Sequence, residues 1–142
     1  MKQQNYSNHS KMVLGFHGIL FVAIVALLIG AIRNLIKATG EDIYGASLLV
    51  LIPLIFLFFM YFTRAFALKA QDRAIKAEEN FRYYLLTGKA LNSKLTMRQI
   101  IGLRFASDEE YIELAERAVK ENLSEKDIKK SIKNWKADNY RV

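Results

Sequence analysis

Few residues of this chain have the types and spacing that chemistry requires. The sequence has no cysteine, which excludes disulfides, thiolate metal sites and cysteine nucleophiles. An ionisable side chain inside a membrane span is a candidate for a functional role, and His17 lies inside an apolar segment. It is therefore a candidate for a haem- or quinone-linked redox role. Bis-histidine haem ligation needs a second histidine within the span, and His9 precedes it. We therefore expect no cofactor, and a neutral His17 hydrogen-bonded to nearby backbone.

Three carboxylates after the second apolar segment are the candidates for acid–base catalysis. Asp72 and Glu78 each have a basic residue four positions later, and Glu79 lies beside them. Opposite charges at that spacing stabilise an exposed helix, so we predict a solvated, salt-bridged face. The sequence contains no nucleophile elbow, phosphate loop or metal-ligand motif. We therefore predict a protein that is not an enzyme and binds no metal.

Two groups of basic residues are candidates for contact with an acidic partner or anionic lipid. One group directly follows the second apolar segment, where lysine and arginine can meet lipid headgroups. The other lies near the C-terminus with Trp135 and Tyr140, and basic residues among aromatic ones can bind RNA, the ribosome or acidic lipid. We favour a solvated surface for this second group. The groups are Arg64, Lys69, Arg73 and Lys76, and Lys129, Lys130 and Lys133.

Two uncharged, apolar segments occupy the N-terminal half of the chain, about residues 12–32 and 43–63. At about 1.5 Å per residue each spans roughly 30 Å as a helix, the thickness of a bilayer's hydrocarbon core. A cleaved signal peptide fits poorly, because its apolar core is usually only about 7–15 residues. The segments therefore predict a transmembrane hairpin over residues 12–63, which turns near Thr39 and Gly40.

The distribution of charge predicts the orientation of this hairpin. The chain has a formal net charge of +7, and most of its basic residues follow Thr63. The tail of residues 1–11 is also basic, whereas the loop between the segments is neutral. Lysine and arginine accumulate on the cytoplasmic side of membrane proteins, so we expect both termini in the cytoplasm.

The two apolar segments differ in residue size. The second is bulky, so we expect it to be the more lipid-exposed span, and Pro53 should kink it. Small residues recur along the first, and they let membrane helices approach closely. They either hold the hairpin together or dock on a helix of a partner. Neither segment contains an acidic or basic residue, which argues against a transporter or channel. The small residues are Gly15, Gly18, Ala23, Ala26 and Gly30.

The C-terminal half is predicted to be helical, which makes the chain an all-α membrane protein. Residues 64–88 should continue the second span as a cytoplasmic helix that ends at Gly88. Residues 89–142 should form a small basic domain of three short helices. Three capping-box patterns mark their starts: Thr96 with Gln99, Ser107 with Glu110, and Ser124 with Asp127. Their apolar faces are Met97, Ile100, Ile101 and Phe105, then Ile112, Ala115 and Val119 flanked by Leu114 and Ala118, then Ile128, Ile132 and Trp135.

The stretches FALKAQDRAIKAEENFR and LRFASDEEYIELAERAVKENLSEKDIKKSIKNWKADNYR, with the opening QNYSNHSKMV, resemble a family of small bacterial inner-membrane proteins classed as a domain of unknown function. The elements QDR…EE…R and LRFASD are the most specific parts. The resemblance covers nearly the whole chain and implies two spans and a cytoplasmic C-terminal region. It supplies no activity and no catalytic residue.

These observations together favour a non-catalytic accessory subunit of a larger bacterial inner-membrane complex. The first span would contact other integral membrane proteins or a second copy of the chain, and the basic domain would face the cytoplasm. An adaptor that binds the ribosome, RNA or anionic lipid is the alternative. A redox subunit that relies on His17 is a further alternative with less support.

Overall fold

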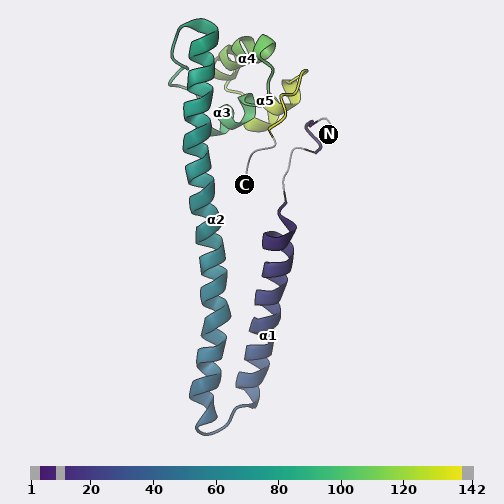
Figure 1. Ribbon diagram of the computed structural model, residues 1–142, viewed down its shortest axis with the longest axis vertical. Coiled ribbons are helices and arrows are strands. Elements are labelled where there is room, and N and C mark those ends of the chain that lie inside the picture. Colours follow the sequence, from purple (N-terminus) through teal and green to yellow (C-terminus); the bar gives the residue numbers. More distant parts are fainter. Residues whose placement is uncertain (1–3, 9–11, 139–142) are drawn as a thin grey trace. The chain divides into compact units, whose positions relative to one another are not determined.

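The computed structural model describes residues 4–8 and 12–138, and within these ranges the chain is helical (Figure 1). The described residues contain no strand, only an isolated bridge between Ala106 and Trp135. The predicted all-α class is therefore confirmed. The elements are a π-helix η1 (Leu14–Leu20), α1 (Phe21–Lys37), α2 (Asp42–Thr87), α3 (Met97–Leu103), α4 (Asp108–Lys120) and α5 (Glu125–Ser131).

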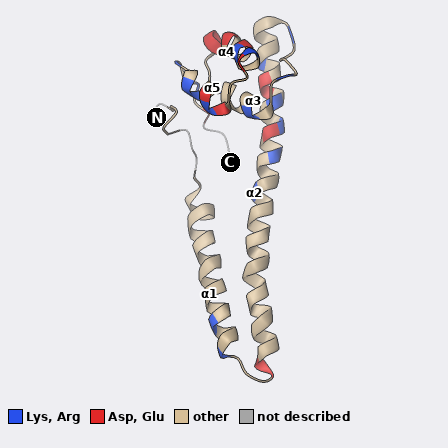
Figure 2. Cartoon of the chain, turned by 180° about the vertical axis from the view of Figure 1, so that it is seen from behind, with Lys and Arg blue, Asp and Glu red and all other residues tan. Residues whose placement is uncertain are grey.

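The chain forms two compact units, which are described separately. The apolar unit contains η1, α1 and α2 as far as Ala67, and the charged unit contains the rest of α2, α3–α5 and tail residues 4–8. Figure 2 shows how strongly lysine, arginine and acidic side chains concentrate in the charged unit.

Two helices are long and apolar enough to cross a membrane, by length and composition alone: Leu14–Lys37 and Asp42–Thr87. Only 11% of the apolar window of each is buried, so the described chain does not shield them as it would the core helix of a soluble protein. The first helix extends to Lys37, and the connection is therefore shorter than the predicted loop. Its basic C-terminal end, with Arg33 and Lys37, complements the negative end of the helix dipole.

Within the apolar unit, α1 and the first part of α2 lie side by side (Figure 1). The buried side chains are Ile24 and Ala31 in α1 and Ala46 and Pro53 in α2. Each pair is spaced by seven residues, which places its members on one face of a helix. Pro53 therefore belongs to the buried face, and α2 continues through it as one helix.

In the charged unit α2 ends where the sequence predicts. Gly88 has a φ of +71° and its amide donates to the Tyr84 carbonyl at 2.8 Å, the usual left-handed end of a helix. Helix α3 begins with the predicted capping box, in which Thr96 and Gln99 satisfy each other's backbone amides. The Gln99 side chain is buried, and its amide nitrogen also donates to the carbonyls of Ala118 and Leu123.

Buried side chains from α2–α5 form the core of the charged unit. Three of its largest members, Tyr111, Phe105 and Leu103, are completely buried. Ile75 is the residue of α2 that enters this core. The tail is attached to the same unit, because the Asp138 amide donates to the side-chain oxygen of Gln4 at 2.7 Å.

The third short helix is shorter than its apolar spacing predicts. Helix α5 ends at Ser131, and Ile132 already has extended backbone angles. Trp135 follows in an extended segment whose neighbours bond to the chain before α4: the Ser107 amide donates to Asn134, and the Lys136 amide to Phe105. These pairings with a segment distant in sequence replace the last helical turn.

The predicted capping box at Ser107 is also absent. The Ser107 hydroxyl makes no capping bond and is buried without a hydrogen-bond partner among the described residues. The carboxylate of Glu110 instead accepts from the amides of Lys133 and Asn134, at 3.1 and 3.0 Å. Helix α4 also packs mainly through Tyr111, Leu114, Ala115 and Ala118, and Ile112 is only partly buried.

We predict that Phe105→Ala lowers the unfolding free energy of the charged unit by about 3–5 kcal/mol, the usual loss for a buried phenylalanine. The Phe105 ring is completely buried and lies 5.1 Å from that of Trp135, the single tryptophan of the chain. Denaturant titration in detergent, followed by tryptophan fluorescence, measures this loss directly. Phe66→Ala is the control, because Phe66 is 62% exposed; an equal loss there would contradict the prediction.

Candidate functional site

The small residues predicted to pack α1 lie mostly away from its buried face. Ala23, Ala26 and Gly30 are exposed, whereas Ile24 and Ala31 are the buried residues of α1. A Cβ atom added at Gly30 would meet nothing within 4 Å. The other two predicted positions belong to η1, where Gly15 is exposed and Gly18 is half-buried. The small residues therefore do not hold the described helices together.

His17 lies in η1, and its contacts are with nearby backbone. Its Nδ1 atom lies 3.3 Å from the amide nitrogen of Val13 and 3.2 Å from the Val13 carbonyl oxygen. Either tautomer can therefore form a hydrogen bond with the turn before it. The ring also meets Phe16 edge-on, with 5.2 Å between centroids. His9 lies outside the described residues, and the described part of the chain has no group of three or more potential metal ligands.

The two basic groups are not equally available to a partner. The first group has three exposed members, Lys69, Arg73 and Lys76. Its fourth member, Arg64, is half-buried and already interacts with another group of the protein. In the second group Lys130 and Lys133 are exposed.

Lys129, the third member of that group, is buried. Its ammonium lies 2.6 Å from the Glu125 carboxylate and 5.3 Å from the centre of the Phe105 ring. It therefore contributes to the fold of α5 rather than to an exposed cationic patch. Tyr140 and Arg141, which extend this stretch in the sequence, lie outside the described residues.

The two ion pairs predicted along α2 do not form in the described structure. Arg82 pairs instead with Glu79 and with Asp108 of α4. Glu79 is buried, and its carboxylate lies 3.3 Å from the Arg82 guanidinium. Glu78 is exposed and does not take Arg82 as its partner, nor does Asp72 pair with Lys76 in the described structure. The reason is that Arg82 turns toward α4, where better-placed acceptors lie.

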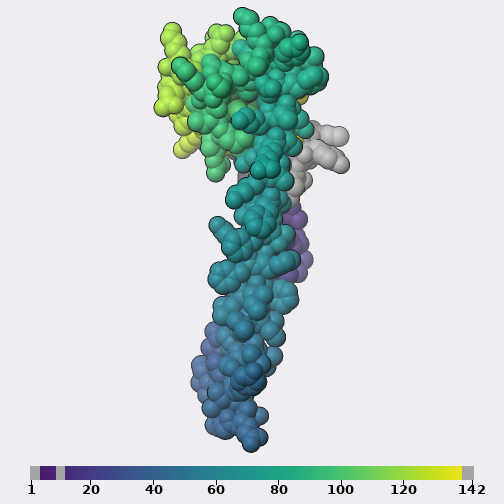
Figure 3. All heavy atoms as spheres, turned by 90° about the vertical axis from the view of Figure 1, so that its left-hand side faces the viewer, coloured from purple at the N-terminus to yellow at the C-terminus, as the bar shows by residue number. Residues whose placement is uncertain are grey.

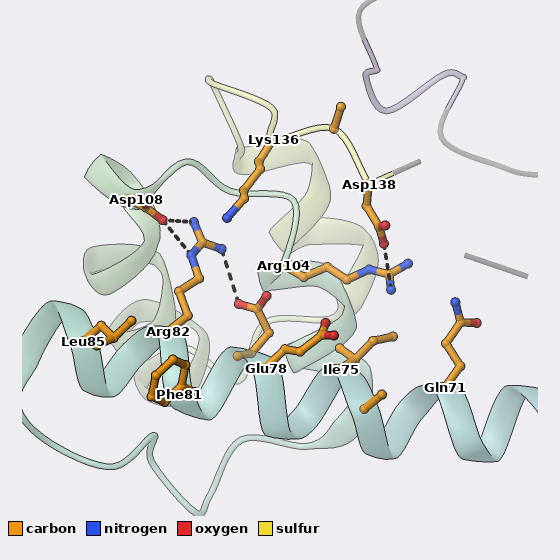
Figure 4. Close-up of a pocket in the computed structure, with 13 residues that line it drawn as sticks. Gln71, Ile75, Glu78, Phe81, Arg82, Leu85, Arg104, Asp108, Lys136 and Asp138 are labelled. Atoms are coloured by element: carbon orange, nitrogen blue, oxygen red, sulfur yellow. Dashed lines mark hydrogen bonds and ion pairs between the residues drawn. The ribbon is translucent and has the colours of Figure 1, made fainter. Parts of the chain in front are cut away.

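Arg82 is the centre of a network that joins α2 to the start of α4 (Figure 4). Its guanidinium donates from Nε to Asp108 at 2.7 Å and from Nη2 to the Ala106 carbonyl at 2.7 Å. It also lies over the Tyr111 ring, 4.2 Å from the centroid. These bonds hold the pKa of Asp108 below its ordinary value of 3.8, and burial raises the pKa of the Tyr111 phenol.

An open pocket of about 520 Å³ adjoins this network in the charged unit. Figure 4 shows a second ion pair on its wall, between Arg104 and Asp138 at 3.0 Å. The Arg104 guanidinium also lies over the Phe105 ring, and its Nε atom is buried without a hydrogen-bond partner. Most charged groups of this pocket are thus committed to one another, an arrangement that fixes structure rather than one that supplies a free acid, base or nucleophile.

Sequence spacing could not reveal the link to α4, because Asp108 and Ala106 lie 24 or more residues from Arg82. The residues of this network do lie in the two stretches on which the family resemblance rests. Glu79 and Arg82 belong to QDR…EE…R, and Ala106 and Asp108 belong to LRFASD. The two stretches QDR…EE…R and LRFASD therefore contact each other.

The fold and these surfaces define an all-helical chain with two helices able to cross a membrane and a small charged unit held by buried ion pairs. The chain belongs to a family described as "Family of unknown function (DUF6526)", whose model matches residues 1–142. No curated protein and no solved structure matches the chain.

We predict that Arg82→Leu lowers the unfolding free energy of the charged unit by about 3–5 kcal/mol, because Glu79 would remain buried without its cation. Arg117→Leu is the matched control. Arg117 is 44% exposed and pairs only with Glu121 one turn away, so its loss should be below about 1 kcal/mol. Equal losses in denaturant titrations of the two variants would refute a special role for Arg82.

Asp108 should give this unit an acid-sensitive contribution to stability. Because its folded pKa lies below 3.8, the contribution is fully present above the ordinary pKa and is lost as the pH falls through the folded value. Asp108→Asn should therefore weaken the dependence of unfolding free energy on pH below about 4. Denaturant titrations of the wild type and this variant at a series of pH values measure the difference, and identical pH dependence would contradict the prediction.

Proposed function

We propose that this protein is a non-catalytic accessory subunit of a larger protein complex in a bacterial inner membrane. The observation that carries the proposal is the exposed small-residue face of α1, formed by Ala23, Ala26 and Gly30. Small residues allow close helix contact in lipid, where bulky side chains would keep helices apart. The proposed partner of this face is a helix of another integral membrane protein.

The same observation argues that α1 has two different contact faces. Ile24 and Ala31 are already buried in the apolar unit, whereas Ala23, Ala26 and Gly30 are exposed and a Cβ atom added at Gly30 would meet nothing within 4 Å. A helix that only anchored the chain could carry leucine at these positions. A second contact face is useful when a further helix packs on α1.

The proposed arrangement follows the distribution of charge. Residues 12–32 and 43–63 would span the membrane as a hairpin, and residues 1–11 and 64–142 would lie in the cytoplasm. The extension helix would end at Gly88, and the basic domain would follow from residue 89. The mutual pairing of Arg82, Glu79 and Asp108 supports a structural rather than a catalytic role for the charged unit.

Gly30→Leu tests the docking face, because the substitution adds a large side chain where the chain itself leaves open space. We expect the variant to insert and fold normally but to lose at least tenfold of the membrane protein that co-purifies with the wild type in mild detergent. Gly45→Leu is the matched control. Gly45 is also a helical glycine with nothing within 4 Å of an added Cβ, but it lies on α2.

Two results would overturn the proposal. One is a wild-type protein that purifies alone from native membranes after gentle solubilisation. The other is co-purification that Gly30→Leu and Gly45→Leu reduce equally, since the contact would then not depend on the small-residue face.

A further inference from the structure

One face of α2 in the charged unit is uncovered although its side chains are apolar. The side chains that α2 buries or half-buries against α3–α5 include Ile75, Glu79 and Arg82. Figure 3 looks at α2 from the side opposite to α3–α5. In this part of α2, Phe81 is 62% exposed and Tyr84 is 55% exposed, although Ala74 and Phe81 also line the open pocket described above.

The exposed apolar residues recur with the spacing of a coiled coil. Ala70, Ala74 and Ala77 are also exposed, and with Phe81 and Tyr84 they are separated by alternating steps of four and three residues. Alternating steps of this kind keep one apolar seam facing a partner helix over several turns. A solvated helix face has no need of this pattern, and aromatic side chains on it are costly in water. We call these five residues the α2 seam.

The charges beside the α2 seam are complementary to those of a second copy. In coiled-coil positions Ala74 and Phe81 take position a, so Arg73 takes position g and Glu78 takes position e. In a parallel pair, position g of one helix meets position e of the next heptad on the other, which brings Arg73 to Glu78 twice by symmetry. Both side chains are exposed and neither has an ion pair within the described chain.

The availability of Glu78 follows from the network described above. Arg82 lies one turn after Glu78 and would be its natural partner within α2, but Arg82 is bound to Glu79 and Asp108. The seam is thus flanked by one unpaired cation and one unpaired anion at the two positions that a parallel copy would join.

We propose that residues 70–84 of α2 form a parallel two-stranded coiled coil with a second copy of this chain. Two copies inserted in one membrane have the same orientation, so a parallel pair is the arrangement open to them. The seam lies on α2 and the docking face on α1, so this contact can hold or fail independently of the accessory role.

Because the natural chain lacks cysteine, single cysteines report the contact without background. In native membranes under mild oxidation, Ala70→Cys and Ala77→Cys should give disulfide-linked dimers of the full chain. Lys76→Cys is the control, because Lys76 is exposed beside Ala77 but points away from the seam. Absence of dimers at both seam positions, or equal dimer yield at Lys76→Cys, would overturn the proposal. Cross-links to a different protein instead of a second copy would also do so.

Charge exchange tests the register of the pair. Arg73→Glu alone should place like charges together at two symmetric points and weaken dimer formation about fivefold at low salt, with a smaller effect at high salt. Glu78→Arg alone should do the same, and the double exchange should restore the wild-type yield. Single exchanges without effect, or a double variant no better than either, would contradict the parallel register. Unfolding titrations monitored at Trp135 should stay unchanged, because both side chains are exposed.

Discussion

The charged unit depends on the contact between Arg82 and the start of α4. Three helices of 7, 13 and 7 residues enclose too little apolar volume to be stable alone, so they require a surface supplied by α2. Ile75 contributes apolar area to that surface, and the guanidinium of Arg82 ties α2 to the start of α4 through Asp108 and the Ala106 carbonyl. Buried Glu79 in turn keeps that cation in place. This one side chain thus joins α2 both to the start of α4 and to the Tyr111 ring in the core.

Part of the positive charge of this unit is paired within the fold. Arg82 and Arg104 both have carboxylate partners and both lie over aromatic rings, which guanidinium groups favour because they are weakly hydrated. Lys129 is likewise paired inside the fold. Net charge therefore overstates the number of cations in this unit that are available to an acidic partner.

Local signals predicted the helices well, and distant contacts account for what was missed. The two long apolar helices, the end of α2 at Gly88 and the box at Thr96 all depend on residues within a few positions of one another. By contrast, α5 ends early because Trp135 pairs with Ala106, nearly thirty residues back. The site residues divide in the same way: the exposure of Gly30 or the burial of Lys129 depends on what lies opposite, which periodicity cannot reveal.

The hydrogen bond between Gln4 and the amide of Asp138 has a consequence for the path of the chain. It joins residues near the two ends of the described chain within one compact unit. A closed path of this kind can pass through a barrier only an even number of times, whatever the charge of its loops. If α1 crosses a bilayer, α2 must cross it back. Parity of crossing thus constrains topology through a single short contact, and it does so without reference to where lysine and arginine accumulate.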